Sequence, residues 1–81
     1  MHLAERSLVR MTCNAKKWYE LEYADDRLTV EQKELFEERY FIFLGMIPNM
    51  PDHCIVVGFD SGKIFSGYDK DNFEYVPEEE V

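Results

Sequence analysis

The acidic residues near the end of the chain have a spacing that could hold a calcium ion. In the segment "DKDNFEYVPEEE", Asp69, Asp71 and Glu80 fall at positions one, three and twelve of an EF-hand loop. Such a loop also needs an oxygen ligand at position five and a glycine at position six, where the chain turns sharply. Phe73 and Glu74 stand at these two positions. We therefore expect no calcium site here, and no metal ion or cofactor elsewhere.

His53 and Cys54 place an imidazole beside a thiol, the pair of groups that acts as base and nucleophile in some enzymes. Neighbouring residues of a strand point to opposite faces, so these two side chains cannot act together. Neither Cys13 nor Cys54 belongs to the C-x-x-C pair that structural zinc sites use. We expect Cys54 to pack as a small hydrophobic residue and His53 to face solvent.

Gly62 and Lys63 in "FDSGK" resemble part of a phosphate-binding loop. The full motif needs a second glycine, a hydroxyl residue after the lysine and a following helix, all of which are missing. The segment predicts a tight turn instead. Because no carboxylate pair has apolar surroundings and a small body offers little volume for a pocket, we expect no enzymatic activity.

Charge is the clearest global feature of this 81-residue chain, which carries a net charge of −8. Residues 69–81 contribute six acids and one base, so most of the excess lies at one end. An acidic chain repels nucleic acid and anionic membrane surfaces. The longest apolar run, "YFIFLGMI", is far shorter than the roughly 20 residues of a membrane span. Two lone cysteines and no signal-peptide pattern predict a cytoplasmic protein with reduced thiols.

The first element that must position these groups is a helix beginning near Ala4. Small and apolar residues recur at steps of three and four along the chain, which is typical of one helical face: Ala4, Leu8, Met11, Ala15 and Trp18. An alternative interpretation takes "SLVRMTC" and "KWYELEY" as two strands of a hairpin. We favour the helix because "NAKK" is a poor hairpin turn.

The second element is a helix within "LTVEQKELFEERYFIFLG". Thr29 and Gln32 form a capping-box pattern at its start, and Gly45 followed by Pro48 predicts its end. One apolar face is predicted, formed by Leu35, Phe36, Tyr40, Phe43 and Leu44. The two helices are expected to be antiparallel and joined by about four residues.

The second half of the chain has the pattern of strands. "IPNMPD" predicts a connector, and the segments 53–59 and 64–68, joined by "DSGK", predict a β-hairpin. Residues 72–76 could add a third strand. The predicted fold class is therefore α+β, with two antiparallel helices followed by a C-terminal hairpin or a small three-stranded antiparallel sheet. We expect one domain over 1–76 and a flexible acidic tail over 77–81.

The function that composition favours is binding of a basic protein partner through acidic side chains. The candidate partner-binding residues are the acids of the second helix and of the chain end: Glu31, Glu34, Glu37, Glu38, Asp69, Asp71 and Glu74. In size, charge and compactness the chain is similar to small inhibitors that phages and mobile elements direct against nucleic-acid enzymes. Such inhibitors mimic a phosphate backbone with their carboxylates. No motif carries this similarity. The alternative is a structural or regulatory homodimer that uses its many aromatic residues as an interface.

Overall fold

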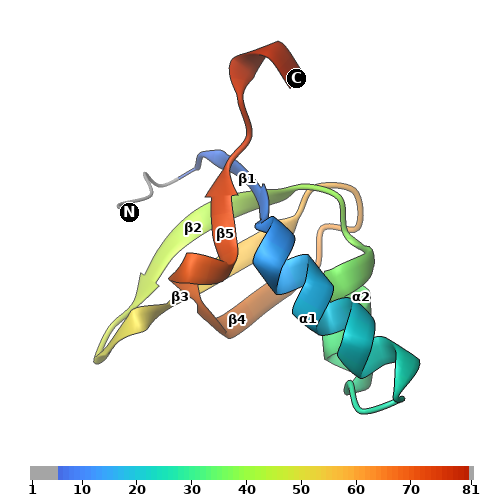
Figure 1. The fold of residues 1–81 in the computed structure, drawn as a ribbon. Coiled ribbons are helices and arrows are strands. Elements are labelled where there is room, and N and C mark those ends of the chain that lie inside the picture. The colour runs from blue at the N-terminus through green and yellow to red at the C-terminus, as the bar shows by residue number, and fades with distance from the viewer. Residues whose placement is uncertain (1–5, 81) are drawn as a thin grey trace.

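The computed structural model describes residues 6–80 and shows two helices packed on a five-stranded antiparallel sheet (Figure 1). The helices are α1 (Cys13–Ala24) and α2 (Val30–Glu37). The strands are β1 (Leu8–Met11), β2 (Phe41–Ile47), β3 (Met50–Gly58), β4 (Ile64–Asp69) and β5 (Phe73–Tyr75). Two short 3-10 helices follow β4 and β5, namely η1 (Lys70–Asn72) and η2 (Glu78–Glu80). The α+β class is confirmed, but the sheet is larger than predicted.

The sheet is strongly curved. Its strand order is β4-β3-β2-β1-β5, so β4 and β5, which follow one another in the chain, lie at opposite edges. The three residues of η1 join them, and a link of this length spans only about 10–14 Å. The two edges must therefore approach each other, and the sheet curls into a partly closed barrel (Figure 1).

The core lies between the inner face of this curved sheet and the helices. Phe41, Phe65 and Phe73 come from three different strands, and the Phe41 ring makes edge-to-face contacts with the other two. α1 contributes Tyr19 and α2 contributes Leu35 to the same buried cluster. Neither helix of the described chain is long and apolar enough to cross a membrane.

The helix predicted from Ala4 is wrong in its first part. Leu8–Met11 is strand β1, with Val9 and Met11 buried and their neighbours half-buried. β1 pairs with both β2 and β5, so partners distant in sequence override the helical spacing. The Thr12 side chain accepts a hydrogen bond from the Ala15 amide and starts α1 one residue later. Ala4 lies outside the described residues.

The capping box of the second helix is confirmed, but its predicted end is wrong. Thr29 and Gln32 exchange side-chain and backbone hydrogen bonds of 3.0 and 3.1 Å. α2 then ends at Glu37, because the aromatic and β-branched residues that follow favour a strand. Phe41 and Phe43 are buried by alternation within β2, and Gly45 lies at a register shift of this strand rather than at a helix end.

The two helices are antiparallel, as predicted, and residues 25–29 join them. Tyr19 in the middle of α1 stacks on Phe36 near the end of α2, whereas Tyr23 further along α1 lies near Lys33.

The C-terminal hairpin of β3 and β4 is confirmed, with residues 60–63 at its turn. The predicted third strand exists as β5, but it pairs with β1 and not with the hairpin. The expected "IPNMPD" connector is wrong, because Pro48 and Asn49 form the turn of a second hairpin between β2 and β3.

Candidate binding site

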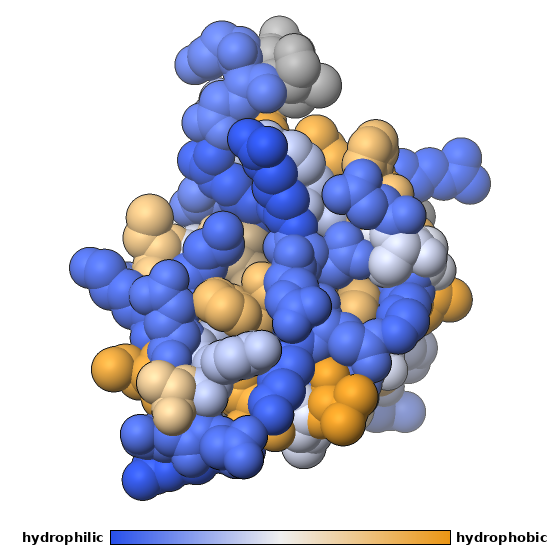
Figure 2. Space-filling model, turned by 90° about the vertical axis from the view of Figure 1, so that its right-hand side faces the viewer, coloured by the Kyte–Doolittle hydropathy of each residue, from blue (hydrophilic) through white to orange (hydrophobic). Residues whose placement is uncertain are grey.

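An open cavity of about 350 Å³ lies between the end of α2 and the turn that joins β3 to β4. We call it the acidic cavity. Its lining residues are Glu34, Glu37, Glu38, Asp60, Ser61, Lys63 and Phe65. Four carboxylates and one ammonium group therefore surround it. Figure 2 views the molecule from the side of α2 and this turn, where hydrophilic side chains separate small apolar areas.

Glu38 occupies a special place in the acidic cavity. It caps the C-terminus of α2 with an extended backbone and is only 8% exposed, the one buried charged residue of the described chain. A methyl group at Gly58 would clash with the Glu38 carboxylate and with the Ser61 hydroxyl. The absence of a side chain at position 58 therefore creates the space that the Glu38 carboxylate fills.

The charges of the acidic cavity are only partly balanced. Lys63 forms an ion pair with Glu34. Glu37, Glu38 and Asp60 form no ion pair with any residue between 6 and 80. The cavity therefore carries an excess of three negative charges, because one ammonium group faces four carboxylates.

Glu31 lies at the other end of α2, near strand β4. Burial, and then the negative charge of Glu31, raise the pKa of the Tyr68 hydroxyl to about 12. Glu31 is exposed and has no ion-pair partner in the described part of the chain. The four predicted glutamates of this region are thus spread along α2. Glu31 lies at the end near Tyr68, and the other three lie at the acidic cavity.

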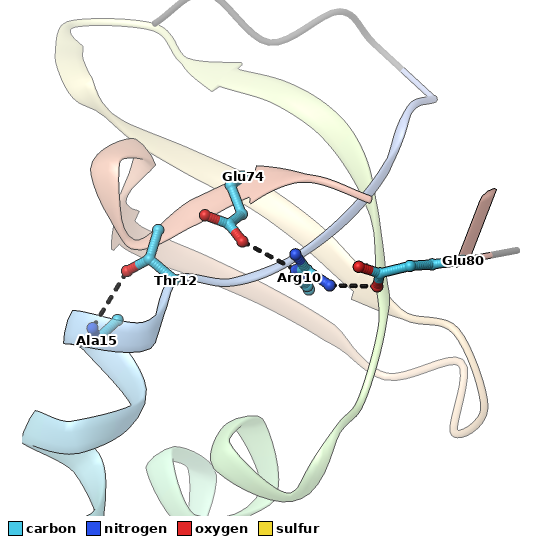
Figure 3. Close-up of polar contacts among 5 residues, drawn as sticks. All are labelled: Arg10, Thr12, Ala15, Glu74 and Glu80. Atoms are coloured by element: carbon cyan, nitrogen blue, oxygen red, sulfur yellow. Dashed lines mark hydrogen bonds and ion pairs between the residues drawn. The ribbon is translucent and has the colours of Figure 1, made fainter. Parts of the chain in front are cut away.

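The predicted acids near the chain end lie elsewhere and hold local structure. The Asp69 carboxylate accepts a 2.9 Å hydrogen bond from the Asp71 amide and caps η1. Glu74 accepts a 2.9 Å hydrogen bond from Arg10 Nε, which joins β5 to β1. Arg10 also pairs with Glu80, so its guanidinium bridges two carboxylates (Figure 3). These ion pairs raise the pKa of Arg10.

The structure also places the residues of the other candidate chemistries. Cys54 is fully buried in the core, as expected, and burial raises the pKa of its thiol to about 11. His53 is half-buried and lies on the opposite face of β3. Within residues 6–80, no group of three or more His, Cys, Asp or Glu side chains is arranged to hold a metal ion.

Four of the seven residues that line the acidic cavity are not predicted site residues, namely Asp60, Ser61, Lys63 and Phe65. Asp60, Ser61 and Lys63 were expected only to form a turn, and they do form it. Their proximity to Glu38 follows from the way α2 lies along the β3–β4 hairpin. No local pattern carries that information, because the two segments are far apart in the chain.

Comparisons of this chain with family models, with curated proteins and with solved structures found no match.

Proposed function

We propose that this protein is a non-catalytic binding module whose α2 side covers a basic surface of a partner protein in the cytoplasm. The observation that supports this proposal best is the acidic cavity with its three unbalanced carboxylates. Carboxylates without a cation partner attract a positively charged surface over about 10 Å at moderate salt. The other predicted acids offer less, because Glu74 is already paired.

The class of partner follows from charge and spacing. The acids from Glu31 to Glu38 extend over about 10 Å along α2. More than one phosphate of a nucleic-acid strand falls within this distance. A basic groove that normally holds a phosphate backbone therefore suits this side of the molecule. Occupation of such a groove would inhibit the partner, and we propose this as the biological effect.

The experiment compares two double charge reversals that change the net charge equally. Glu31→Lys with Glu37→Lys alters exposed residues of α2 that have no ion-pair partner in the described chain. Glu20→Lys with Glu79→Lys is the matched control, since both residues are exposed and lie on α1 and η2. The protein is immobilised and retained host proteins are measured at low and high salt, with and without competing nucleic acid.

The proposal predicts retention of a basic protein that weakens steeply with salt and is displaced by nucleic acid. The α2 variant should lose this retention, while the control variant keeps it. Equal losses in both variants would show that total charge and not this site is responsible, and salt-insensitive retention would contradict the proposal outright.

A second candidate function, self-association, is favoured by the outer face of the sheet. Leu8, Ile42, Val57 and Ile64 are consecutive register partners across β1, β2, β3 and β4, so their side chains share one face. Ile64 is 67% exposed and the other three are half-buried. An apolar row across four strands is a surface that a homodimer could bury.

Self-association and partner binding are separated by one measurement. If the apolar row joins two copies, sedimentation at high salt should show a dimer that Ile64→Glu converts to a monomer. A monomer at all salt concentrations would remove this candidate and leave the acidic side as the functional surface.

A further inference from the structure

The Glu38 side chain is buried, but its carboxylate has no protein partner. The residue is 8% exposed, and the carboxylate forms no hydrogen bond or ion pair with any other described residue. No side-chain oxygen in this part of the chain is both fully buried and unpaired. The Glu38 oxygens must therefore open into the acidic cavity that the residue lines. A carboxylate shielded from water in this way is stabilised by a cation that enters the cavity.

The walls of the cavity define the cation that fits. Glu37 and Asp60 provide two more unpaired carboxylates, and Ser61 provides a hydroxyl group. Phe65, an almost fully buried ring, provides an apolar wall. A volume of about 350 Å³ is far larger than a metal ion requires. Bound calcium would need several oxygens at about 2.3–2.6 Å, and residues 6–80 hold no such group.

We propose that the acidic cavity receives the guanidinium group of one arginine side chain from the basic partner. A guanidinium is planar and carries five N–H donors in a fixed fork, so it can bridge carboxylates that are set apart. A lysine ammonium is a compact, strongly hydrated point charge and cannot bridge these carboxylates in the same way. This inference names the chemistry by which the proposed function would recognise its partner.

Lys63 acts as an internal competitor in this arrangement. Its ammonium group occupies Glu34 and so keeps one of the four carboxylates from an incoming cation. The cavity is thereby left with Glu38 as its innermost free carboxylate, flanked by Glu37 and Asp60. An arginine bound at Glu38 should therefore also affect the amides of Gly58, against which the Glu38 carboxylate lies, and of Ser61, which lines the cavity.

The test uses two model peptides and the full chain. The ¹⁵N-labelled protein is titrated with acetyl-Gly-Gly-Arg-Gly-Gly-amide and, separately, with the same peptide containing lysine. Amide shifts should concentrate at Glu38, Gly58 and Ser61. The arginine peptide should bind about tenfold more tightly, the ratio expected when one extra charge-assisted hydrogen bond is made. Equal affinities, or shifts spread over all acidic surfaces, would overturn the proposal.

Two variants and a control connect the binding to individual carboxylates. Glu38→Gln keeps the shape of the buried side chain but removes its charge, and Asp60→Asn changes an exposed turn residue. Each should weaken arginine-peptide binding about tenfold or more. Glu20→Gln on α1 should leave it unchanged. If Glu38→Gln fails to fold, judged from its amide spectrum, Asp60→Asn decides alone, and wild-type binding by that variant would refute the assignment.

The outcome is distinguishable from that of the proposed function. Arginine-peptide binding without retention of any basic host protein would support the cavity and contradict the proposed function. Retention of a basic protein that is unaffected by Glu38→Gln and Asp60→Asn would support the function and contradict the cavity.

Discussion

Glu38 shows how a single residue can connect two distant elements of the fold. Its backbone ends α2, and its carboxylate lies against Gly58 in the wall of the acidic cavity. Any side chain at position 58 would push the carboxylate away. The position of this charge therefore depends on a glycine of strand β3, a dependence that only the three-dimensional arrangement reveals.

Tyr68 should make the stability of the protein depend on pH in the alkaline range. Burial and the charge of Glu31 raise the pKa of its hydroxyl to about 12, against about 10 in an unfolded chain. Between these pH values the unfolded chain loses its proton first, so the free energy of unfolding falls as the pH rises through this window. Urea unfolding at pH 8 and pH 11 should show that Tyr68→Phe removes about 1 kcal/mol of this fall, a value discounted for partial exposure.

Tyr23→Phe is the control for this measurement, because Tyr23 is an exposed residue of α1. It tests whether the loss of any tyrosine hydroxyl produces the same change. Tyr19, whose pKa is also raised by burial, will keep part of the alkaline loss in every variant. A Tyr68→Phe protein that loses as much stability as the wild type would show that Tyr68 ionises normally in the folded state.

At the scale of elements, the capping box determines where α2 begins. Thr29 accepts a hydrogen bond from the Gln32 amide, and the Gln32 side chain accepts one from the Thr29 amide. Thr29→Ala should lower the free energy of unfolding by about 1 kcal/mol, measured by urea unfolding. Thr29→Ser should retain most of it, because the hydroxyl remains. Equal losses in both variants would mean that the hydrogen bond to the Thr29 hydroxyl is not the source of the loss.

The elements that the sequence predicted correctly are those with local signals. Thr29 and Gln32 indicate the start of α2, and the residues "DSGK" indicate the turn between β3 and β4. In contrast, the apolar residues of β1 and β2 also match a helical period, so their spacing predicts helices where the structure has strands. Leu8 pairs with Ile42, and Val9 pairs with Tyr75, so these strands form through partners that lie far away in sequence.

One signal for β2 was nevertheless present in the sequence. "YFIF" combines aromatic and β-branched residues, and Phe41 and Phe43 alternate with half-buried neighbours. The candidate site shows the same division. The glutamates of α2 could be named from their pattern, whereas Asp60 and Lys63 join them only through the packing of α2 beside the hairpin.

At the scale of the whole molecule, the fold depends on its last strand. Phe73 of β5 is 3% exposed and contacts Phe41 at the centre of the core. Phe73→Ala should cost about 3–5 kcal/mol. A domain of this length has a total stability of only about 4–12 kcal/mol, so circular dichroism should show a largely unfolded or strongly destabilised protein.

Deletion of residues 77–81 is the companion experiment. It removes Glu80 and its exposed ion pair with Arg10, a type of contact that contributes little to stability because solvent screens it. The shortened chain should therefore keep its circular dichroism spectrum and almost all of its stability, in agreement with the prediction that this segment is a tail. A deletion as damaging as Phe73→Ala would show that the segment belongs to the folded unit.

The pairing of β1 with β5 also determines how the molecule responds to mechanical force. Val9 lies opposite Tyr75 and Met11 lies opposite Phe73, so the start of β1 and the end of β5 are at the same end of the pair. Tension applied before Leu8 and after Val76 would load these hydrogen bonds one after another, like a zipper, rather than all at once. The β1–β5 pair should therefore separate under low force, while the β2–β3–β4 sheet remains intact.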